Sequence, residues 1–407
     1  MNDSLPVIVS AVRTAIGRKG GALAGYQASE LGGIVIREAV ARAGVAPEDI
    51  TDVILGNTLS PQGNVARVAS LHAGLGESVP ALTIDRQCGS GINSVALAAQ
   101  AVLATGGIYV AGGAESMTNE PHQLARSARA YDAQPPRFLR RELAPAEIGD
   151  PVMGITAENL AADYGISRSA QDAYALESQK RMAAAQARGA FDEHLVGVAQ
   201  PDGSLFLRDE HPRADSSIEK LASLRSVFDP EGSVTAGNAS GINDGAAATV
   251  VMSRAEANAR GITPLATITG WAVAGVDPTR MGIGPVPAVR KLLAATGQRL
   301  EDFDLVELNE AFAAQVLACQ EELRIPAEKL NVLGGAIAHG HPIAATGTML
   351  IAKIITELGT RGLRRGLVTA CIGGGQGIAL SLEREIPGMD APLADLTSAE
   401  SATRSQA

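Results

Sequence analysis

Three short turns of this chain each combine a reactive side chain with glycine. Cys88 lies in the run QCGSG, His341 in GHP and Cys371 in CIGGGQG. Because glycine has no Cβ, a ligand or another backbone segment can approach such turns closely. A single buried cysteine is most often just a small hydrophobic residue. Two cysteines and a histidine in turns of this type indicate instead a nucleophile, its activating base and a second proton carrier.

Cys88 follows a predicted strand at 81–84 and precedes a predicted helix at 92–104. At such a turn the free N–H groups and the dipole of the helix favour an anion, which predicts a lowered pKa for the Cys88 thiol. A thiolate that accepts an acyl group becomes a thioester, which stays reactive toward a second nucleophile. The position of Cys88 therefore predicts an acyl-accepting nucleophile.

His341 is the candidate base for Cys88. It can take the thiol proton if the fold brings the two residues together, and Pro342 restricts the turn that aims the ring. A hydrogen-bonded core histidine is the alternative. His339 and His341 are two residues apart, but no CxxC or HxxxH spacing supplies further ligands, so no metal site is expected.

Cys371 is the candidate for the second proton transfer. A thiol with a pKa near neutrality can take a proton from a carbon next to a thioester carbonyl. The resulting enolate needs hydrogen-bond donors, and the backbone N–H groups of Cys88 and of the turn Gly373–Gly375 can form an oxyanion hole.

Asn309 follows a predicted strand at 305–308, the end of a strand where sites gather in open α/β sheets. Its amide can orient a water or a carbonyl, or it can simply cap the next helix. Glu310 shares this position. Cys319, further along the predicted helix, is expected to pack in the core.

The apolar pattern of the chain predicts the same α/β unit twice. Strands are expected at 7–11, 51–55, 81–84, 108–111, 267–271, 305–308 and 367–371, and helices at 29–44, 92–104, 287–296, 311–323 and 346–358. The first β-α-β segment predicts parallel pairing of its two strands. The spacing from Cys88 to Gly106 equals that from His341 to Gly359, which predicts an internal duplication. Chance similarity of two βα units is the alternative.

The length of 407 residues predicts more than one domain, and 46% hydrophobic with only 3% aromatic residues favours closely packed α/β layers. An N-terminal half is expected at 1–117, completed by about 235–265, and a C-terminal half at 266–387. The composition of the stretch 118–234 predicts an inserted loop lobe that covers a ligand, with a polar helix at 169–189 on the surface. The segment 388–407 is expected to be a disordered tail.

The net charge of −10 argues against a nucleic-acid surface. Three cysteines without a CxxC pair predict reduced thiols and a cytoplasmic protein. No signal peptide pattern and no apolar stretch of membrane-spanning length are evident. Gly89-Ser90-Gly91 imitates half of a dinucleotide fingerprint, but Ser94 replaces its third glycine, so hydride transfer is not expected.

Together these runs resemble the thiolase family over nearly the whole chain. The matching motifs are CGSG at Cys88, GGAESM at 112–117, MGITAEN at 153–159, VTAGNASGINDGAAA at 234–248, MGIGPVPA at 281–288, NEAFAAQ at 309–315, GHP at 340–342 and CIGGGQG at 371–377. The resemblance implies a five-layer αβαβα fold of two duplicated halves, with an inserted loop lobe over the coenzyme A (CoA) site. It also implies a homotetramer or homodimer.

The resemblance further implies a ping-pong Claisen reaction on short- to medium-chain acyl-CoA, run as thiolytic cleavage of 3-ketoacyl-CoA or as condensation. By family likeness Cys88 takes the acyl group, His341 activates it and Cys371 moves the proton at the acyl α-carbon. Asn309, with a water, and His341 match one oxyanion hole, and the N–H groups of Cys88 and Gly373 match the other.

For CoA itself, Ser240 matches a serine that touches the pantetheine arm, and Arg213 stands where a CoA-contacting arginine is found. Lys220 and Arg225 would complete a basic patch on the lobe, whose alternative is a solvated charged face. No cofactor beyond the CoA substrates is implied. A non-catalytic acyl-CoA carrier is disfavoured by the intact reactive residues. A decarboxylating condensing enzyme is disfavoured because it typically has a second histidine where Cys371 stands.

Overall fold

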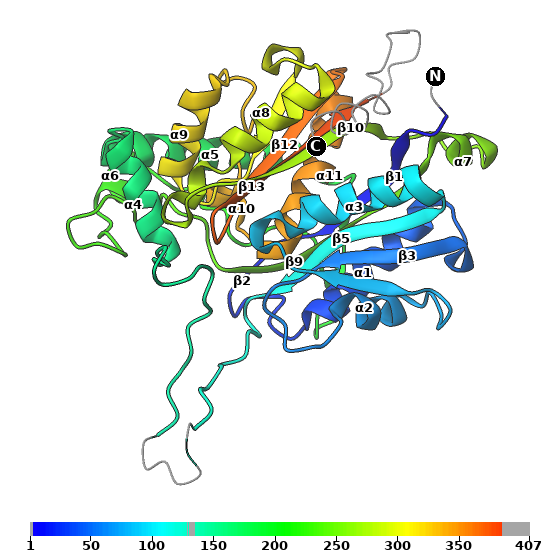
Figure 1. Cartoon of the computed structure of the whole chain (residues 1–407), viewed down its shortest axis with the longest axis horizontal. Coiled ribbons are helices and arrows are strands. Elements are labelled where there is room, and N and C mark those ends of the chain that lie inside the picture. Colours follow the sequence, from blue (N-terminus) through cyan, green and yellow to red (C-terminus); the bar gives the residue numbers. More distant parts are fainter. Residues whose placement is uncertain (1–2, 128, 130–134, 385–407) are drawn as a thin grey trace.

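The computed structural model describes residues 3–127, 129 and 135–384, so the predicted tail at 388–407 lies outside the described residues. The chain folds into alternating helical and sheet layers (Figure 1). The first half contains β1 (Pro6–Thr14), β2 (Gly17–Arg18), α1 (Ala28–Ala43), β3 (Ile50–Gly56), α2 (Val65–Ala73), β4 (Ala81–Ile84), α3 (Ser90–Thr105), β5 (Ile108–Ser116), β9 (Asn243–Ser253) and α7 (Arg254–Ala259). The second contains β10 (Ala266–Gly275), α8 (Pro285–Thr296), β11 (Leu305–Leu308), α9 (Ala313–Leu323), α10 (Ala336–His339), α11 (Ile343–Arg361), β12 (Arg365–Ile372) and β13 (Gln376–Glu383).

The strand order is the same in both halves. It reads β3-β5-β9-β1 in the first and β11-β12-β13-β10 in the second, with β4 added at the edge of the first. In each half the first pair is parallel and the next two pairs are antiparallel. The halves meet where β1 pairs with β10, Val7 opposite Thr267 and Ile8 opposite Ala266. The predicted duplication of one α/β unit is therefore confirmed.

Three helical layers sandwich these strands and complete the αβαβα fold. Helices α1 and α2 cover the first half from outside, and α8 and α9 cover the second. Helices α3 and α11 lie between the two halves, where α3 packs on β3 and β5 and α11 contacts both β5 and β12. A helix buried between two sheets must be apolar on all sides. This burial explains why the segment Gln87–Thr105, which ends with α3, and helix α11 are long and apolar enough to cross a membrane by length and composition, contrary to the sequence expectation.

Two local predictions are wrong. Strands β1 and β3 do not pair with each other, because β9 and β5 lie between them in the sheet. The returning strand β9 comes from far along the chain, so local sequence carries no sign of it. Helix α11 also runs past Gly359 and ends at Gly362, whose φ of 65° is left-handed. The equal spacing from Cys88 to Gly106 and from His341 to Gly359 therefore does not locate the C-terminal end of α11.

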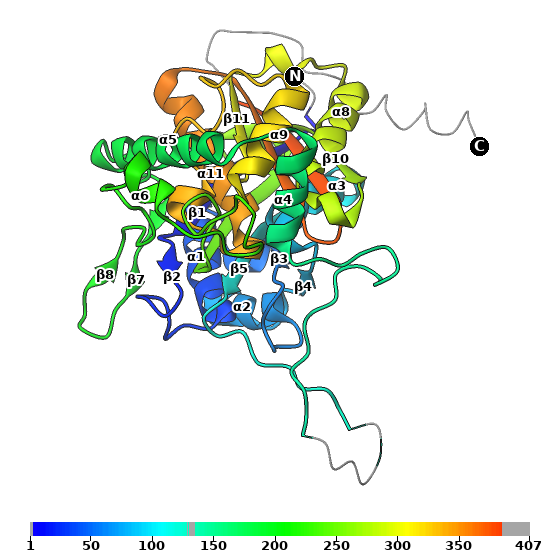
Figure 2. The ribbon, with the colours of Figure 1, turned by 90° about the vertical axis from the view of Figure 1, so that its left-hand side faces the viewer.

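The inserted lobe contains α4 (Met153–Asp163), α5 (Arg168–Ala187), α6 (Ile218–Ala222) and the short strands β6 (Leu195–Val196), β7 (Val198–Ala199) and β8 (Leu205–Phe206). Between β5 and α4 the chain leaves the body as a long extended excursion, clear in both views (Figures 1 and 2). Helix α5 is not simply a surface helix, because Gln171, Asp172 and Ser178 on one face are buried. That face packs against α9 and α10 of the second half.

Candidate active site

The N-terminal ends of α3 and α11 touch in the middle layer. A Cβ on Gly91 would lie 2.7 Å from the backbone nitrogen of Thr348, and a Cβ on Gly347 would lie 2.5 Å from that of Ile92. The hydroxyl of Thr348 donates a 2.9 Å hydrogen bond to the Gly91 carbonyl. Only glycines permit this approach. Because Cys88 and His341 each stand two residues before one of these helices, the contact brings their turns together.

The His341 ring is buried and held on both nitrogens. Its Nδ1 lies 2.6 Å from the Thr346 hydroxyl, one turn into α11, and its Nε2 lies 3.4 Å from the Asn309 side-chain amide. The backbone N–H of His341 donates to Asn243 Oδ1 at 3.0 Å. The preceding Gly340 has a φ of 99° and packs against that same amide, so a side chain there would clash.

Hydrogen bonding assigns the tautomer of His341. The Thr346 hydroxyl also lies 2.9 Å from the Pro342 carbonyl, which can only accept. If the single hydroxyl hydrogen goes to that carbonyl, the Thr346 oxygen accepts from Nδ1–H of the ring. The neutral ring then carries its proton on Nδ1, and Nε2 presents its lone pair as an acceptor, with the Asn309 amide nitrogen 3.4 Å away. That is the form a general base for Cys88 requires.

The predicted lowering of the Cys88 pKa is wrong. Burial raises the pKa of this thiol to about 11, although the backbone N–H groups of Gly373 and of Cys88 itself act in the opposite direction. Loss of solvation is the largest effect on this thiol, and the nearby carboxylates Glu115 and Asp85 add smaller contributions in the same direction. Burial likewise lowers the pKa of His341 to about 4. The resting pair is therefore a neutral thiol and a neutral imidazole.

Cys371 lies at the end of β12, buried in a small apolar cluster with Ala157, Met281 and Phe312. Burial raises its pKa well above the ordinary value, and Cys88 adds to that rise, so the two sulfurs are within electrostatic range of each other. A pKa near neutrality was expected, and desolvation in this apolar setting is the reason for the difference. Cys371 is thus a protonated thiol facing the Cys88 side of the site.

The glycine turn after Cys371 carries backbone donors toward Cys88. The Gly373 N–H points at the Cys88 sulfur, and it acts there together with the N–H of Cys88. Gly374 and Gly375 have φ of 84° and 85°, which other residues rarely adopt. The Met153 side chain covers Gly373 so closely that a Cβ there would lie 2.4 Å from its methyl carbon. The two N–H groups predicted for an oxyanion hole therefore converge.

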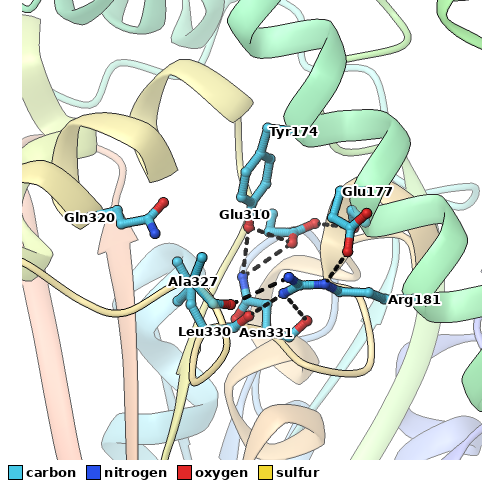
Figure 3. Close-up of a pocket in the computed structure, with 9 residues that line it drawn as sticks. Tyr174, Glu177, Arg181, Glu310, Gln320, Ala327, Leu330 and Asn331 are labelled. Atoms are coloured by element: carbon cyan, nitrogen blue, oxygen red, sulfur yellow. Dashed lines mark hydrogen bonds and ion pairs between the residues drawn. The ribbon is translucent and has the colours of Figure 1, made fainter.

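Asn309 is buried directly after β11, and its amide nitrogen faces His341, while its Oδ1 finds no hydrogen-bond partner among the residues that the structure describes. Its neighbour Glu310 points elsewhere, into a polar pocket of about 100 Å³ (Figure 3). There Glu310 accepts from Tyr174 at 2.8 Å and from Asn331 at 3.1 Å. Glu310 therefore ties α5 to the second half, and only Asn309 of the pair belongs to the candidate site.

The predicted CoA residues lie along the lobe. Arg213, Lys220 and Arg225 are exposed, while Ser240 is half-buried and its N–H donates to the Ala311 carbonyl at 2.9 Å, close to Asn309 in the chain. The basic patch also contains a carboxylate that was not predicted. Asp215 pairs with Lys220 at 2.6 Å, and the charge of Arg213 helps to lower the pKa of Asp215.

Sequence reasoning missed three buried polar residues of this region: Thr346, Asn57 and Glu115. Thr346 stands five residues after His341, in the first turn of the following helix, and a hydroxyl so near in sequence could have identified it. Glu115 lies inside the motif GGAESM, where a carboxylate at the end of an apolar strand is a clear signal. Among the described residues, no three His, Cys, Asp or Glu side chains gather as metal ligands.

Comparison with known proteins agrees with this geometry. The thiolase N-terminal domain model matches residues 6–255 and the thiolase C-terminal domain model matches 262–384. An acetyl-CoA acetyltransferase of Cupriavidus necator is 47% identical over 394 residues, covering 93% of this chain and 99% of that protein. The structure of the Bacillus anthracis acetyl-CoA acetyltransferase matches with a TM-score of 0.87 and 43% identity, covering 94% and 99% of the two chains. Human mitochondrial 3-ketoacyl-CoA thiolase in complex with CoA matches with a TM-score of 0.89 and 38% identity, covering 94% and 98%.

An αβαβα fold of two like halves, with two thiols and a histidine at their junction, defines an acyltransferase of the thiolase type. The chain belongs to the thiolase family. The resemblance and the fold class predicted from sequence are both confirmed.

Proposed function

We propose that this thiolase cleaves 3-ketoacyl-CoA with CoA, or condenses two acyl-CoA molecules in reverse, through an acyl-enzyme on Cys88. The observation that supports the proposal is the contact between the ends of α3 and α11, which follow Cys88 and His341, together with the electrostatic influence of Cys88 on Cys371 at the end of β12. The short- to medium-chain acyl group is supported by the bulk of Met153, Met281 and Phe312 around Cys371, which leaves an apolar but crowded environment.

In the cleavage direction the Cys88 sulfur attacks the keto carbon while its proton passes to Nε2 of His341. The bond between that carbon and the neighbouring α-carbon breaks, and the α-carbon takes the proton of Cys371. The product acetyl-CoA leaves, and the acyl group stays on Cys88 as a thioester. Both thiols are protonated at rest, so each can supply the proton that its step needs.

In the second half-reaction the CoA thiol gives its proton to the Cys371 thiolate and attacks the acyl carbon. The Cys88 sulfur leaves and recovers its proton from His341, which restores the starting enzyme. Charge on the acyl oxygen is stabilised by the N–H groups of Cys88 and Gly373. Charge on the thioester enolate is stabilised by His341 together with a water oriented by Asn309, whose free Oδ1 supports this role.

We further propose that CoA is held by Arg213, Lys220 and Arg225 of the lobe together with Ser240, which follows the lobe in the chain. The steps above exchange only protons and acyl groups between these side chains and CoA thioesters, so no resident cofactor enters them. A cytoplasmic location fits three free cysteines. A homotetramer or homodimer is supported by the extended segment between β5 and α4. The side chains of Phe138 and Leu124 there are 71% and 53% exposed, and their burial against another copy of the chain would be favourable.

Mass spectrometry after mixing the enzyme with acyl-CoA tests the central step. The acyl group should appear on the peptide that contains Cys88, and finding it on Cys371 or Cys319 would reverse the assignment. Rates with acetoacetyl-CoA, a medium-chain 3-ketoacyl-CoA and 3-ketoadipyl-CoA would then define the chain length.

A further inference from the structure

Strand pairing allows the two halves to be matched residue by residue. An axis normal to an antiparallel pair exchanges residues that lie directly opposite, so where β1 meets β10 it exchanges Val7 with Thr267. The irregularities after Ile8 in β1 and after Ile268 in β10 then coincide, and Ser10, opposite Val250 of β9, matches Gly270, opposite Ser381 of β13. Val250 of the first half therefore corresponds to Ser381 of the second.

The same register identifies the partners at the active-site end of the sheets. Five residues before Val250 and Ser381 stand Gly245 and Gln376, and these lie opposite Glu115 on β5 and Ile372 on β12. Glu115 thus occupies the position in the first half that Ile372, the neighbour of Cys371, occupies in the second, and both side chains face the middle layer.

The parallel strands extend the match by one more pair. Leu55 lies opposite Gly112 and Leu308 lies opposite Thr369, so Asn57 corresponds to Glu310. Cys88 and His341 correspond, each standing two residues before a middle-layer helix. Asn57 and Glu115 thus have no reactive counterparts in the second half, and their role follows from their own contacts.

In the described part of the chain, every hydrogen-bond partner of the Glu115 carboxyl group is an N–H group. Its fully buried carboxylate accepts from the Asn57 amide at 2.9 Å, from the backbone N–H groups of Thr58 at 3.2 Å and Leu59 at 3.1 Å, and from that of Ala344 at 3.2 Å. The first three belong to the loop after β3. Ala344 belongs to the other half, in the first turn of α11, three residues after His341.

This geometry separates Glu115 from the proton-transfer groups. Its four donors occupy the lone pairs that would otherwise exchange protons with a substrate. Its side chain lies at the N-terminal end of α11, whose free N–H groups favour the ionised carboxylate and so oppose the effect of burial. Burial raises the pKa of Glu115 to about 8, with Asp85 adding to the rise, while the N–H donors of Leu59, Ala344 and Thr58 lower it.

We propose that Glu115, held by Asn57, is a positioning residue that fixes the His341 turn against the Cys88 turn across the local two-fold axis. The inference rests on the proposed role of His341 as the base for Cys88. The carboxylate links the loop after β3, next to the Cys88 half of the site, to the helix whose first turn carries His341. Without it, the two helical ends can shift while each half stays folded.

The test is the rate at which iodoacetamide alkylates Cys88, followed by peptide mass spectrometry. In Glu115→Gln the amide must turn an N–H₂ group toward N–H donors, so the link to Ala344 is lost or weakened. The expected alkylation rate falls about 10- to 100-fold, as for a misplacement of about 1 Å. In a His341→Ala background, Glu115→Gln should change the rate less than about twofold, because the residue acts through His341.

Two further variants keep the test decisive. Asn57→Ala should also slow the alkylation of Cys88, by a smaller factor than Glu115→Gln. In the Glu115→Gln background it should slow the reaction no further. It also serves if the glutamine variant fails to fold. The matched control is Glu383→Gln, another buried carboxylate, paired with Arg364 and Arg365 at the far end of β13, and it should leave the rate unchanged.

The outcomes distinguish this inference from the proposed function. If His341→Ala slows alkylation but Glu115→Gln and Asn57→Ala do not, the positioning role is wrong and the function stands. If Glu115→Gln slows alkylation equally with and without His341, its effect is general and the positioning role is also wrong. If His341→Ala itself leaves the rate unchanged, the base assignment fails and the inference fails with it.

Discussion

Removal of one hydroxyl group, in Thr346→Val, should impair the base without disturbing the fold. The Thr346 oxygen lies 2.6 Å from His341 Nδ1 and is the only partner that the described residues give this nitrogen. Valine has nearly the same shape but cannot accept the Nδ1–H bond. A buried donor left without a partner costs about 1–3 kcal/mol. If this cost falls on the productive tautomer, acylation slows about 5- to 150-fold.

The assay is a single-turnover measurement of acyl transfer to Cys88 from acetyl-CoA, with product identified by mass spectrometry. Thr346→Ser keeps the hydroxyl and should retain the wild-type rate within about twofold. Thr249→Val is the matched control, because that threonine is also fully buried but donates to the Ala111 carbonyl in the middle of the sheet. It should lower stability slightly and leave acylation unchanged.

Two results would refute the reasoning. Wild-type acylation in Thr346→Val would show that the hydroxyl does not set the tautomer of His341. A serine variant as slow as the valine variant would point to packing of the threonine methyl group instead of the hydrogen bond.

Further predictions concern the second thiol, the CoA patch and acid stability. Cys371→Ala should still be acylated at Cys88, but exchange of acetyl α-protons into deuterated solvent should fall at least ~100-fold, and near-normal exchange would contradict its role. Arg213→Ala should raise KM for CoA about two- to fivefold at low salt with kcat nearly intact, an effect that disappears at high salt; an unchanged KM at low salt would remove it from the site. Burial lowers the pKa of His211 to about 4, so the ring stays neutral in the folded protein. In the unfolded chain this histidine takes up a proton below about pH 6.5. It therefore destabilises the fold as the pH falls from 6.5 to 4. His211→Gln should therefore flatten the fall of Tm between pH 6.5 and 4, and an unchanged slope would contradict this.

The sequence by itself determined the local elements and the reactive turns. Apolar runs and glycine ends located the strands and helices within a few residues, because periodicity and capping are short-range properties. Glycine next to Cys88, His341 and Cys371 marked the places where backbones must come close, and the structure brings these turns together. The apolar helices α3 and α11 were recognisable in the sequence. Their enclosure between the two halves of the sheet was not.

Only the tertiary structure decided how these pieces act on one another. A strand arriving from residue 243 separates β1 from β3, which no local pattern can reveal. The direction in which the Cys88 pKa shifts depended on burial, which raises it, and not on the helix dipole, which the sequence suggested would lower it. Thr346 sets the tautomer of His341 through a contact only five residues along the chain, whereas Glu115 joins the two halves through a contact made only after folding. The residue type of Glu115 was visible in the chain, but its bond from Ala344 is fixed by packing between segments more than 200 residues apart.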